Sequence, residues 1–312
     1  MSGFSVQDGL NLLSKLTLRR VWNALRVLTS YYLSKYTGRA VQWGLPISIS
    51  VEPTTSCNLR CPECPSGLRS FTRATDLNPA FLEMVRYASQ KKIYTATSTN
   101  AHYLTDENAR RTIESGLDRL IISIDGTTQE VYEQYRVGGQ LQKVLDGAAR
   151  VVKWKKELRS KTPFIVFQFL VVRPNEHQIE EARQLARRIG VDDIWFKTAQ
   201  IYDYEKDPHQ LIPTRQEYSR YRRTPRGNEF KGRLANHCWR LWHDPVITWN
   251  GLVAPCCFDK DAQYKMGNLQ QQSFVEIWRS EPYRQFRAKI LQGRKQIDIC
   301  SNCSEGTRVW GS

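Results

Sequence analysis

Several kinds of segment are missing from this sequence, and each absence excludes a class of protein. No apolar run reaches the roughly 18 residues that a membrane-spanning helix needs, and no charged-then-apolar signal peptide opens the chain. Neither an internal repeat nor a recognisable nucleic-acid-binding module is present. We therefore expect a cytoplasmic protein without a transmembrane helix and without a specific nucleic-acid partner.

The composition is that of a folded protein with a strong positive charge. The 312 residues are 40% hydrophobic, which suffices for one large α/β domain and a smaller attachment. Lysine and arginine number 46 against 31 acidic residues, a net charge of +15. Such a charge suits an anionic partner, such as a membrane surface, a leader peptide or a phosphorylated substrate. It equally serves solubility and local counter-charge for cysteine thiolates.

The first 45 residues form a basic amphipathic helical extension. Leucine, valine and tyrosine recur there at helical spacing, with lysine and arginine between them. Two interpretations fit this pattern. The helix lies on the inner face of a membrane as a peripheral contact, or it packs across the open end of the core.

Strands and helices alternate from residue 46 to residue 199. The predicted elements are, in chain order, strand 47–51, helix 79–90, strand 93–98, helix 105–115, strand 119–124, helix 139–156, strand 164–172, helix 176–188 and strand 193–198. Such alternation predicts a parallel sheet or a partial (β/α) barrel. Residues 200–237 are expected to be a polar linker with a short helix, and residues 238–312 a small α+β domain rich in cysteine.

Cysteine is the residue type that carries the chemistry. Eight cysteines in a cytoplasmic protein indicate metal or cluster ligation, because that compartment keeps thiols reduced. Cys57, Cys61 and Cys64 lie in one loop after the first predicted strand. Three such thiolates can hold a cubane cluster and leave one iron open to another ligand. A zinc site would want a fourth ligand nearby, and the adjacent loop offers neither histidine nor cysteine.

Polar residues follow two of the predicted strands. Asn100 follows the predicted strand 93–98, and Ser123 and Asp125 lie at the end of the next predicted strand, 119–124. Ligands of α/β folds bind at the carboxyl ends of strands, so these side chains should face the cysteine loop. Asp125 could equally cap the helix after Gly126. Glu52 is a weaker candidate at the end of the first strand.

A second group of cysteines lies in the last third of the chain. Cys300 and Cys303 follow a predicted helix at 273–291, and a hairpin turned at Asn250-Gly251 carries the Cys256-Cys257 pair back towards Cys238. Four thiolates can then enclose a second cluster, with structural zinc as the alternative. Cys256 and Cys257 would face opposite ways on a strand, so either could be the ligand.

The spacing CxxxCxxC after the first strand of a β/α domain resembles the signature of the radical S-adenosylmethionine (radical SAM) proteins. The resemblance implies that Cys57, Cys61 and Cys64 hold three irons of a [4Fe–4S] cluster and that SAM binds the fourth. It implies contacts to SAM from Asn100, Ser123 and Asp125. A reductant such as flavodoxin or ferredoxin would supply an electron, and a 5′-deoxyadenosyl radical would abstract hydrogen from the substrate.

The C-terminal cysteines are similar to those of the SPASM/twitch auxiliary domains, and most of all to the twitch form with one cluster. That resemblance implies an auxiliary [4Fe–4S] cluster on Cys238, Cys256, Cys300 and Cys303, with Cys257 spare. By the same resemblance Asp259 could act as a catalytic base. A role in stabilising a turn is the alternative.

The sequence departs from the family pattern between Cys64 and residue 93. No Gly-Gly-Glu-Pro-like motif is present, and the chain passes from about Ala74 to Leu77 as if one β/α unit were missing. The expected function is hydrogen abstraction from a peptide, a sugar or a lipid-linked substrate. One alternative is a degenerate protein that binds clusters but does not turn over SAM. The other is a protein that structural zinc stabilises and that binds an anionic partner.

Overall fold

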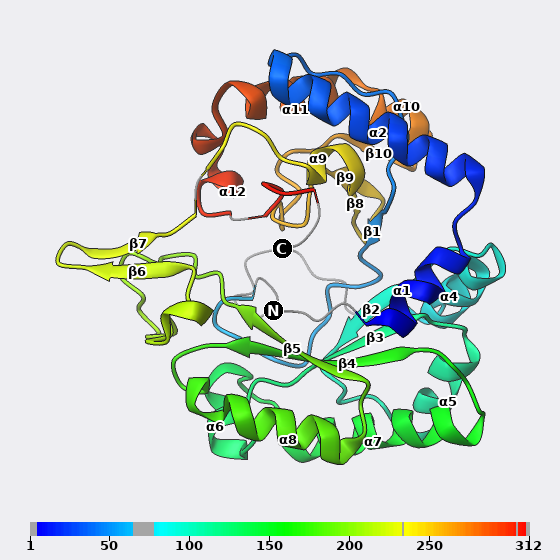
Figure 1. Ribbon diagram of the computed structural model, residues 1–312, viewed down its shortest axis with the longest axis vertical. Coiled ribbons are helices and arrows are strands. Elements are labelled where there is room, and N and C mark those ends of the chain that lie inside the picture. The colour runs from blue at the N-terminus through cyan, green and yellow to red at the C-terminus, as the bar shows by residue number, and fades with distance from the viewer. Residues whose placement is uncertain (1–4, 65–77, 233, 304, 310–312) are drawn as a thin grey trace. The chain divides into compact units, whose positions relative to one another are not determined.

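The computed structural model describes residues 5–64, 78–232, 234–303 and 305–309, and it divides into two compact units (Figure 1). The core unit comprises residues 5–15, 57–64 and 78–230, and the C-terminal unit comprises residues 16–56 and the described residues from 231 onward. Each unit has hydrophobic clusters of its own.

The core unit is built on a four-stranded parallel sheet. Its strands pair in chain order, β2 (Ala96–Thr99), β3 (Arg119–Ser123), β4 (Phe164–Val171) and β5 (Asp193–Thr198). Parallel neighbours need crossover connections, and helices supply them. These are α5 (Asp106–Glu114), α6 (Gln129–Tyr135), α7 (Leu141–Glu157) and, after the 3-10 turn η1 (Glu176–Gln178), α8 (Ile179–Ile189). Within the described residues the sheet is open and does not close into a barrel.

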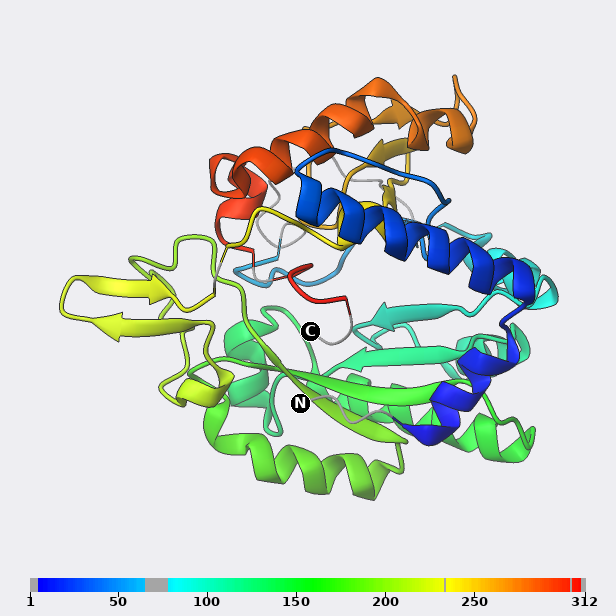
Figure 2. The same ribbon diagram turned by 45° about the horizontal axis from the view of Figure 1, so that its top comes forward.

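Helices α5 to α8 lie on one side of this sheet in both views (Figures 1 and 2). The central strand β4 is buried along nearly its whole length, as its continuous apolar sequence requires. Its inner side chains meet those of α7, including Val144, Ala148 and Val151, which are fully buried. The helix α4 (Phe81–Gln90) precedes β2.

Most predicted elements of the core are present, with ends displaced by a few residues. The strand at 193–198 has the predicted bounds, and α5 begins after Thr105, whose hydroxyl accepts from the Asn108 amide. The bounded elements of the sequence analysis omit α6, although a helix after Gly126 was considered as one that Asp125 could cap. Thr128 caps that helix, so the interpretation of Asp125 as its cap was wrong.

The first part of the predicted linker belongs to the core unit. It contains η2 (Gln216–Tyr218) and an antiparallel hairpin of β6 (Tyr221–Thr224) and β7 (Gly227–Phe230). Ile201, Leu211, Ile212 and Tyr221 are buried in one cluster with Leu59 and Cys61. The expectation of a polar linker was wrong for this part of the chain. A few apolar residues among many polar ones suffice to anchor the segment to the core unit.

The C-terminal unit holds a small mixed sheet in the order β1 (Ser50–Val51), β8 (Val246–Ile247), β9 (Leu252–Ala254) and β10 (Gly267–Asn268). The predicted hairpin at Asn250-Gly251 is confirmed, and Gly251 has φ +82°. The helices of this unit are α2 (Leu18–Thr37), α9 (Arg240–His243), α10 (Phe274–Trp278), α11 (Glu281–Gly293) and α12 (Asp298–Ser301), with the 3-10 turn η3 (Arg294–Gln296) before α12. The single helix predicted at 273–291 is two, because Ser280 starts a new helix with Pro282 in its first turn.

The first strand is the clearest correction. The sequence analysis places strand 47–51 in the parallel core, whereas β1 pairs in parallel with β8 of the C-terminal unit. Alternation of apolar residues predicts an extended strand but does not say which strand is its neighbour. The predicted gap between Ala74 and Leu77 lies outside the described residues.

The predicted N-terminal extension divides between the two units. In the core unit, α1 (Val6–Ser14) is held by an ion pair of Asp8 with Arg119 and by hydrogen bonds from Asn11 and Lys15 to Asp118. In the C-terminal unit, α2 buries Val27 and Tyr31 against Trp239 and Trp242. None of the helices in the described ranges is long and apolar enough to span a membrane.

Candidate metal centres

The three-cysteine loop of the core unit is anchored by its apolar residue. Leu59 is buried, and the Arg60 amide donates to the Val137 carbonyl at 3.0 Å. Cys57 is exposed, Cys64 is half-buried and Cys61 is buried. The Cys64 amide donates to the Cys61 carbonyl at 3.2 Å, which forms a tight turn between these two residues. The loop thus presents one thiol to the interior and one to solvent.

Two side chains donate towards the thiols of this loop. The Asn100 Nδ2 atom lies 3.8 Å from Cys57 Sγ and 2.8 Å from Asn58 Oδ1. The Arg136 Nη1 atom lies 3.8 Å from Cys61 Sγ. Burial raises the pKa of the Cys61 thiol to about 11, and the Arg136 charge opposes that shift. Both donors would favour a thiolate over a thiol.

Arg136 is held by Asp125 in a buried ion pair. Asp125 is fully buried, with one oxygen accepting from Arg136 Nε and the other from the Leu170 amide at 2.7 Å. Burial raises the pKa of Asp125, whereas Arg136 and the Leu170 amide lower it. Burial alone would lower the pKa of Arg136, but the Asp125 carboxylate and Cys61 raise it above its ordinary value. The largest influence on Asp125 is burial, and its net pKa lies above the ordinary value.

The predicted polar residues therefore reach the loop in different ways. Asn100 follows β2 and contacts Cys57 directly, whereas Asp125 follows β3 and acts through Arg136. Ser123 is the last residue of β3 and is buried. Glu52 follows β1 in the C-terminal unit, where burial raises its pKa.

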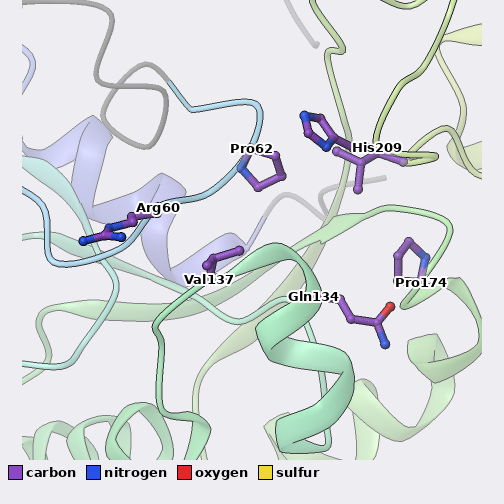
Figure 3. A pocket seen from close by; sticks show the side chains of 7 residues that line it. Arg60, Pro62, Gln134, Val137, Pro174 and His209 are labelled. Atoms are coloured by element: carbon purple, nitrogen blue, oxygen red, sulfur yellow. The ribbon is translucent and has the colours of Figure 1, made fainter.

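A hollow of about 510 Å³ lies beside the same loop. Arg60 and Pro62, which flank Cys61, line one part of it, and Gln134, Pro174 and His209 line others (Figure 3). Its lining, within the described residues, includes none of the three cysteines.

The C-terminal unit gathers four buried thiols, those of Cys238, Cys256, Cys300 and Cys303. Burial raises the pKa of each, to about 12 for Cys300 and about 11 for Cys303. The Cys256 thiol interacts electrostatically with Cys257, Cys238 and Cys300, and Cys257 also acts on Arg240. Cys256 shares the burial of Cys238, Cys300 and Cys303, whereas Cys257 is half-buried.

Arg294 is the buried cation of this second group. It is fully buried, and its guanidinium donates to the backbone carbonyls of His237, Cys303 and Glu305 at 3.1, 3.1 and 2.7 Å. Its Nε atom is buried and has no hydrogen-bond partner among the residues that the structure describes. The Arg294 charge lowers the pKa of Cys238, Cys300 and Cys303 against the effect of burial.

The backbone next to Cys238 is fitted closely to its sulfur. Gly306 has φ +71°, and a Cβ atom there would lie 2.4 Å from Cys238 Sγ. The amides of Arg240 and Leu241, at the start of α9, also lower the pKa of Cys238.

Asp259 is buried, and its two oxygens accept from the amides of Gln263 and Tyr264 at 2.8 and 2.9 Å. Its carboxylate therefore stabilises a turn.

Both groups fit iron–sulfur clusters chemically. Isolated thiolates at such buried positions would be costly, whereas coordinated metal ions stabilise them. Arg136 and Arg294 supply positive charge and N–H donors at the two groups. No three histidine, cysteine or carboxylate groups within the described ranges are placed to hold a single metal ion.

Comparison with known proteins agrees with this chemistry. Residues 238–304 match the SPASM family model, an iron–sulfur cluster-binding domain. The chain is 24% identical over 314 aligned residues to the PqqA peptide cyclase of Gluconobacter oxydans, covering 85% of each protein. It is 25% identical over 308 residues to the AdoMet-dependent heme synthase of Nitratidesulfovibrio vulgaris, covering 77% of this chain and 81% of that protein.

This chain is a radical SAM protein with a SPASM domain. Its cofactors are [4Fe–4S] clusters and S-adenosylmethionine.

Solved structures show the same fold at lower identity. Streptococcus suis SuiB bound to S-adenosylmethionine superposes with a TM-score of 0.59 at 12% identity, over 89% of this chain and 76% of that one. The protein anSMEcpe with bound AdoMet superposes with a TM-score of 0.53 at 14% identity, over 81% and 84%.

The sequence analysis missed the arginines at both cysteine groups. Arg136 directly follows α6, a helix for which the sequence analysis gave no bounds. Arg294 lies six residues before Cys300 and directly before Lys295, and the sequence does not indicate which of these two basic residues is buried.

Proposed function

We propose that the core unit holds a SAM-binding cluster on Cys57, Cys61 and Cys64 and that the C-terminal unit holds an auxiliary cluster on Cys238, Cys256, Cys300 and Cys303. The observation that carries the proposal is the division of the thiols into a group of three and a group of four, in separate units. Three thiols leave one iron for SAM, and four complete a cluster.

The polar residues of the core unit have separate roles in this proposal. Asn100 orients the exposed Cys57, and Ser123 lies at the strand end where SAM would bind. Both oxygens of Asp125 are engaged, so Asp125 holds Arg136 against Cys61 instead of contacting SAM itself. When bound on Cys57, Cys61 and Cys64, the cluster would supply the electron for reductive cleavage of SAM, and hydrogen abstraction from the substrate would be the chemistry that follows.

A peptide is the substrate class that we favour over a sugar or a lipid-linked molecule. PqqA peptide cyclase is named for a peptide substrate, and SuiB has been solved with its precursor peptide SuiA. The positive charge of the chain suits an acidic leader segment. Flavodoxin or ferredoxin is the proposed reductant.

Anaerobic reconstitution with iron and sulfide tests the proposal. The parent should bind about eight irons per chain, and Cys57→Ala/Cys61→Ala/Cys64→Ala should bind about four and make no 5′-deoxyadenosine from SAM. The matched control is Cys257→Ala, which should keep the iron content of the parent. Unchanged iron in the triple variant would overturn the ligand assignment.

A second candidate is a protein that binds both clusters but does not turn over SAM. The absence of a Gly-Gly-Glu-Pro-like motif in the sequence favours it. Full iron content without 5′-deoxyadenosine after reduction with dithionite would select this candidate. The same iron content with that product selects the enzyme.

A further inference from the structure

The outer face of α2 is apolar, although it points away from the core of its own unit. The inner face carries Val27, Ser30, Tyr31 and Ser34, all buried. The opposite face carries Leu18, Trp22 and Tyr36, which are 91%, 64% and 78% exposed. Val21, Leu25, Tyr32 and Leu33 extend the same exposed surface. Surface helices of globular proteins normally place polar residues on this side.

The spacing shows that these residues form one stripe, in which Thr29 is the polar residue between Leu25 and Tyr32. Leu18, Trp22, Leu25, Tyr32 and Tyr36 follow one another at intervals of three, four or seven residues, which return to one side of a helix. Figure 2 shows α2 (blue) as a long helix with α11 of the same unit beside it. The stripe therefore runs over most of the length of the longest described helix.

The charge around this stripe is of one sign. No aspartate or glutamate occurs between Asp8 and Glu52, and six basic residues lie between them: Lys15, Arg19, Arg20, Arg26, Lys35 and Arg39. Arg19 and Arg26 are exposed on one flank of the stripe. On the other flank the Lys35 ammonium lies 5.8 Å and 5.6 Å from the ring centroids of Tyr32 and Tyr36.

We propose that the outer face of α2 docks on an anionic lipid membrane. An interfacial helix buries its apolar stripe at the acyl boundary and places basic residues at the headgroups. Tryptophan and tyrosine favour that boundary, because one end of each is apolar and the other polar. The helix lies in the surface and does not span it, in keeping with its hydropathy.

A second copy of the chain fits this face less well. Self-association would bring two identical basic surfaces together, and like charges brought together at an interface are repulsive. Anionic headgroups instead match the charge on both flanks. The proposal concerns α2 alone and is independent of both cysteine groups.

Vesicle co-sedimentation of the reconstituted protein tests the proposal. Vesicles of phosphatidylcholine with one third phosphatidylglycerol should bind the parent, whereas pure phosphatidylcholine vesicles should bind it much less. The double variant Trp22→Glu/Leu25→Glu should lose binding by more than about tenfold, because it places charge in the apolar stripe. Arg19→Gln/Arg26→Gln should weaken binding by roughly fivefold for each arginine, and salt should weaken that of the parent.

The control variant is Met84→Glu/Tyr87→Glu, which changes two exposed apolar residues of α4 and should bind as the parent does. Iron content and circular dichroism confirm that each variant is folded. Equal binding to neutral and anionic vesicles, or parental binding by Trp22→Glu/Leu25→Glu, would overturn the proposal. A dimer in light scattering that this double variant converts to monomer would also overturn it, in favour of self-association.

Discussion

An arginine lies at each of the two cysteine groups, half-buried in the core unit and fully buried in the C-terminal unit, and the two differ in the groups that accept from them. In the core unit, Arg136 is paired with the Asp125 carboxylate and offers one N–H to Cys61. In the C-terminal unit, Arg294 donates to three backbone carbonyls. These carbonyls accept from its two Nη atoms without cancelling its charge. Four thiolates carry one more negative charge than three, so the larger group gains from a cation that keeps its charge.

The groups also differ in exposure. Cys57 is exposed and Cys64 half-buried, whereas the four proposed auxiliary ligands are all buried. A proposed SAM-binding site must admit a second molecule, and a proposed auxiliary site with four protein ligands need not. The predictions below test this contrast, from the largest expected effect to the smallest.

Removing the Asp125 carboxylate should have the largest effect on stability. Asp125→Asn would leave the Arg136 charge buried without its counter-ion, at a cost of about 3–5 kcal/mol in unfolding free energy. Anaerobic urea denaturation of the apoprotein measures it. The control Asp106→Asn changes an exposed carboxylate and should leave the midpoint unchanged. Equal urea midpoints for Asp125→Asn and Asp106→Asn would show that the Asp125–Arg136 ion pair contributes nothing to stability.

Arg294→Met should lower the free energy of unfolding by somewhat less, about 2–4 kcal/mol. It removes donors from buried carbonyls but leaves no charge buried without a partner. It should also lower the reduction potential of the auxiliary cluster, measured by redox titration, because a nearby cation favours the reduced form. Arg279→Met, at an exposed arginine after α10, is the matched control. A potential equal to that of the parent would contradict the proposed role of the Arg294 charge.

The C-terminal unit should lose stability at mildly acid pH through His243. Burial lowers the pKa of His243 to about 4, from its ordinary value of 6.5. Between these two values the unfolded chain binds a proton at His243 and the folded chain does not. Stability therefore falls as pH drops from 6.5 towards 4, by about 3 kcal/mol. His243→Gln should flatten this part of the pH profile of unfolding. If the slope of stability against pH were unchanged in His243→Gln, another group would cause the loss of stability at acid pH.

The smallest effect on stability should come from a pair of glycines. Gly38 and Gly306 both have φ +71°, so alanine at either should cost about 1 kcal/mol of backbone strain. No atom lies within 4 Å of a Cβ at Gly38, whereas a Cβ at Gly306 would meet Cys238 Sγ. Gly306→Ala alone should therefore reduce iron in the auxiliary site. Parental iron content in Gly306→Ala would count against Cys238 as a ligand.

Local patterns explain which features of the fold could be predicted from the sequence. Strands β3, β4 and β5 are short apolar runs between amphipathic helices, and their parallel pairing follows from that alternation. The hairpin at Gly251 follows from its Asn-Gly turn. By contrast, α6 is short and polar, and β6 and β7 alternate weakly, so neither gives a strong periodic signal.

The candidate sites divide in the same way. The spacing of the cysteines predicts two groups of thiols, and the structure gathers them in two units. Ser123 and Asn100 were predicted as site residues because they lie at the ends of predicted strands, a position that can be read from the order of residues along the chain. Asp125 was predicted to contact SAM, but both of its oxygens are already engaged by Arg136 and Leu170. Contacts between residues far apart in sequence have no local signature.

By itself, the sequence determined the cysteine spacing, the alternation that makes a parallel sheet and the positive charge of the N-terminal region. These depend on neighbours along the chain, where periodicity and turn chemistry act. Only the tertiary structure decided that β1 pairs with β8, that Arg136 and Arg294 are the cations at the two thiol groups, and that the apolar stripe of α2 faces outward. Those outcomes depend on burial, which is set by the whole packed unit.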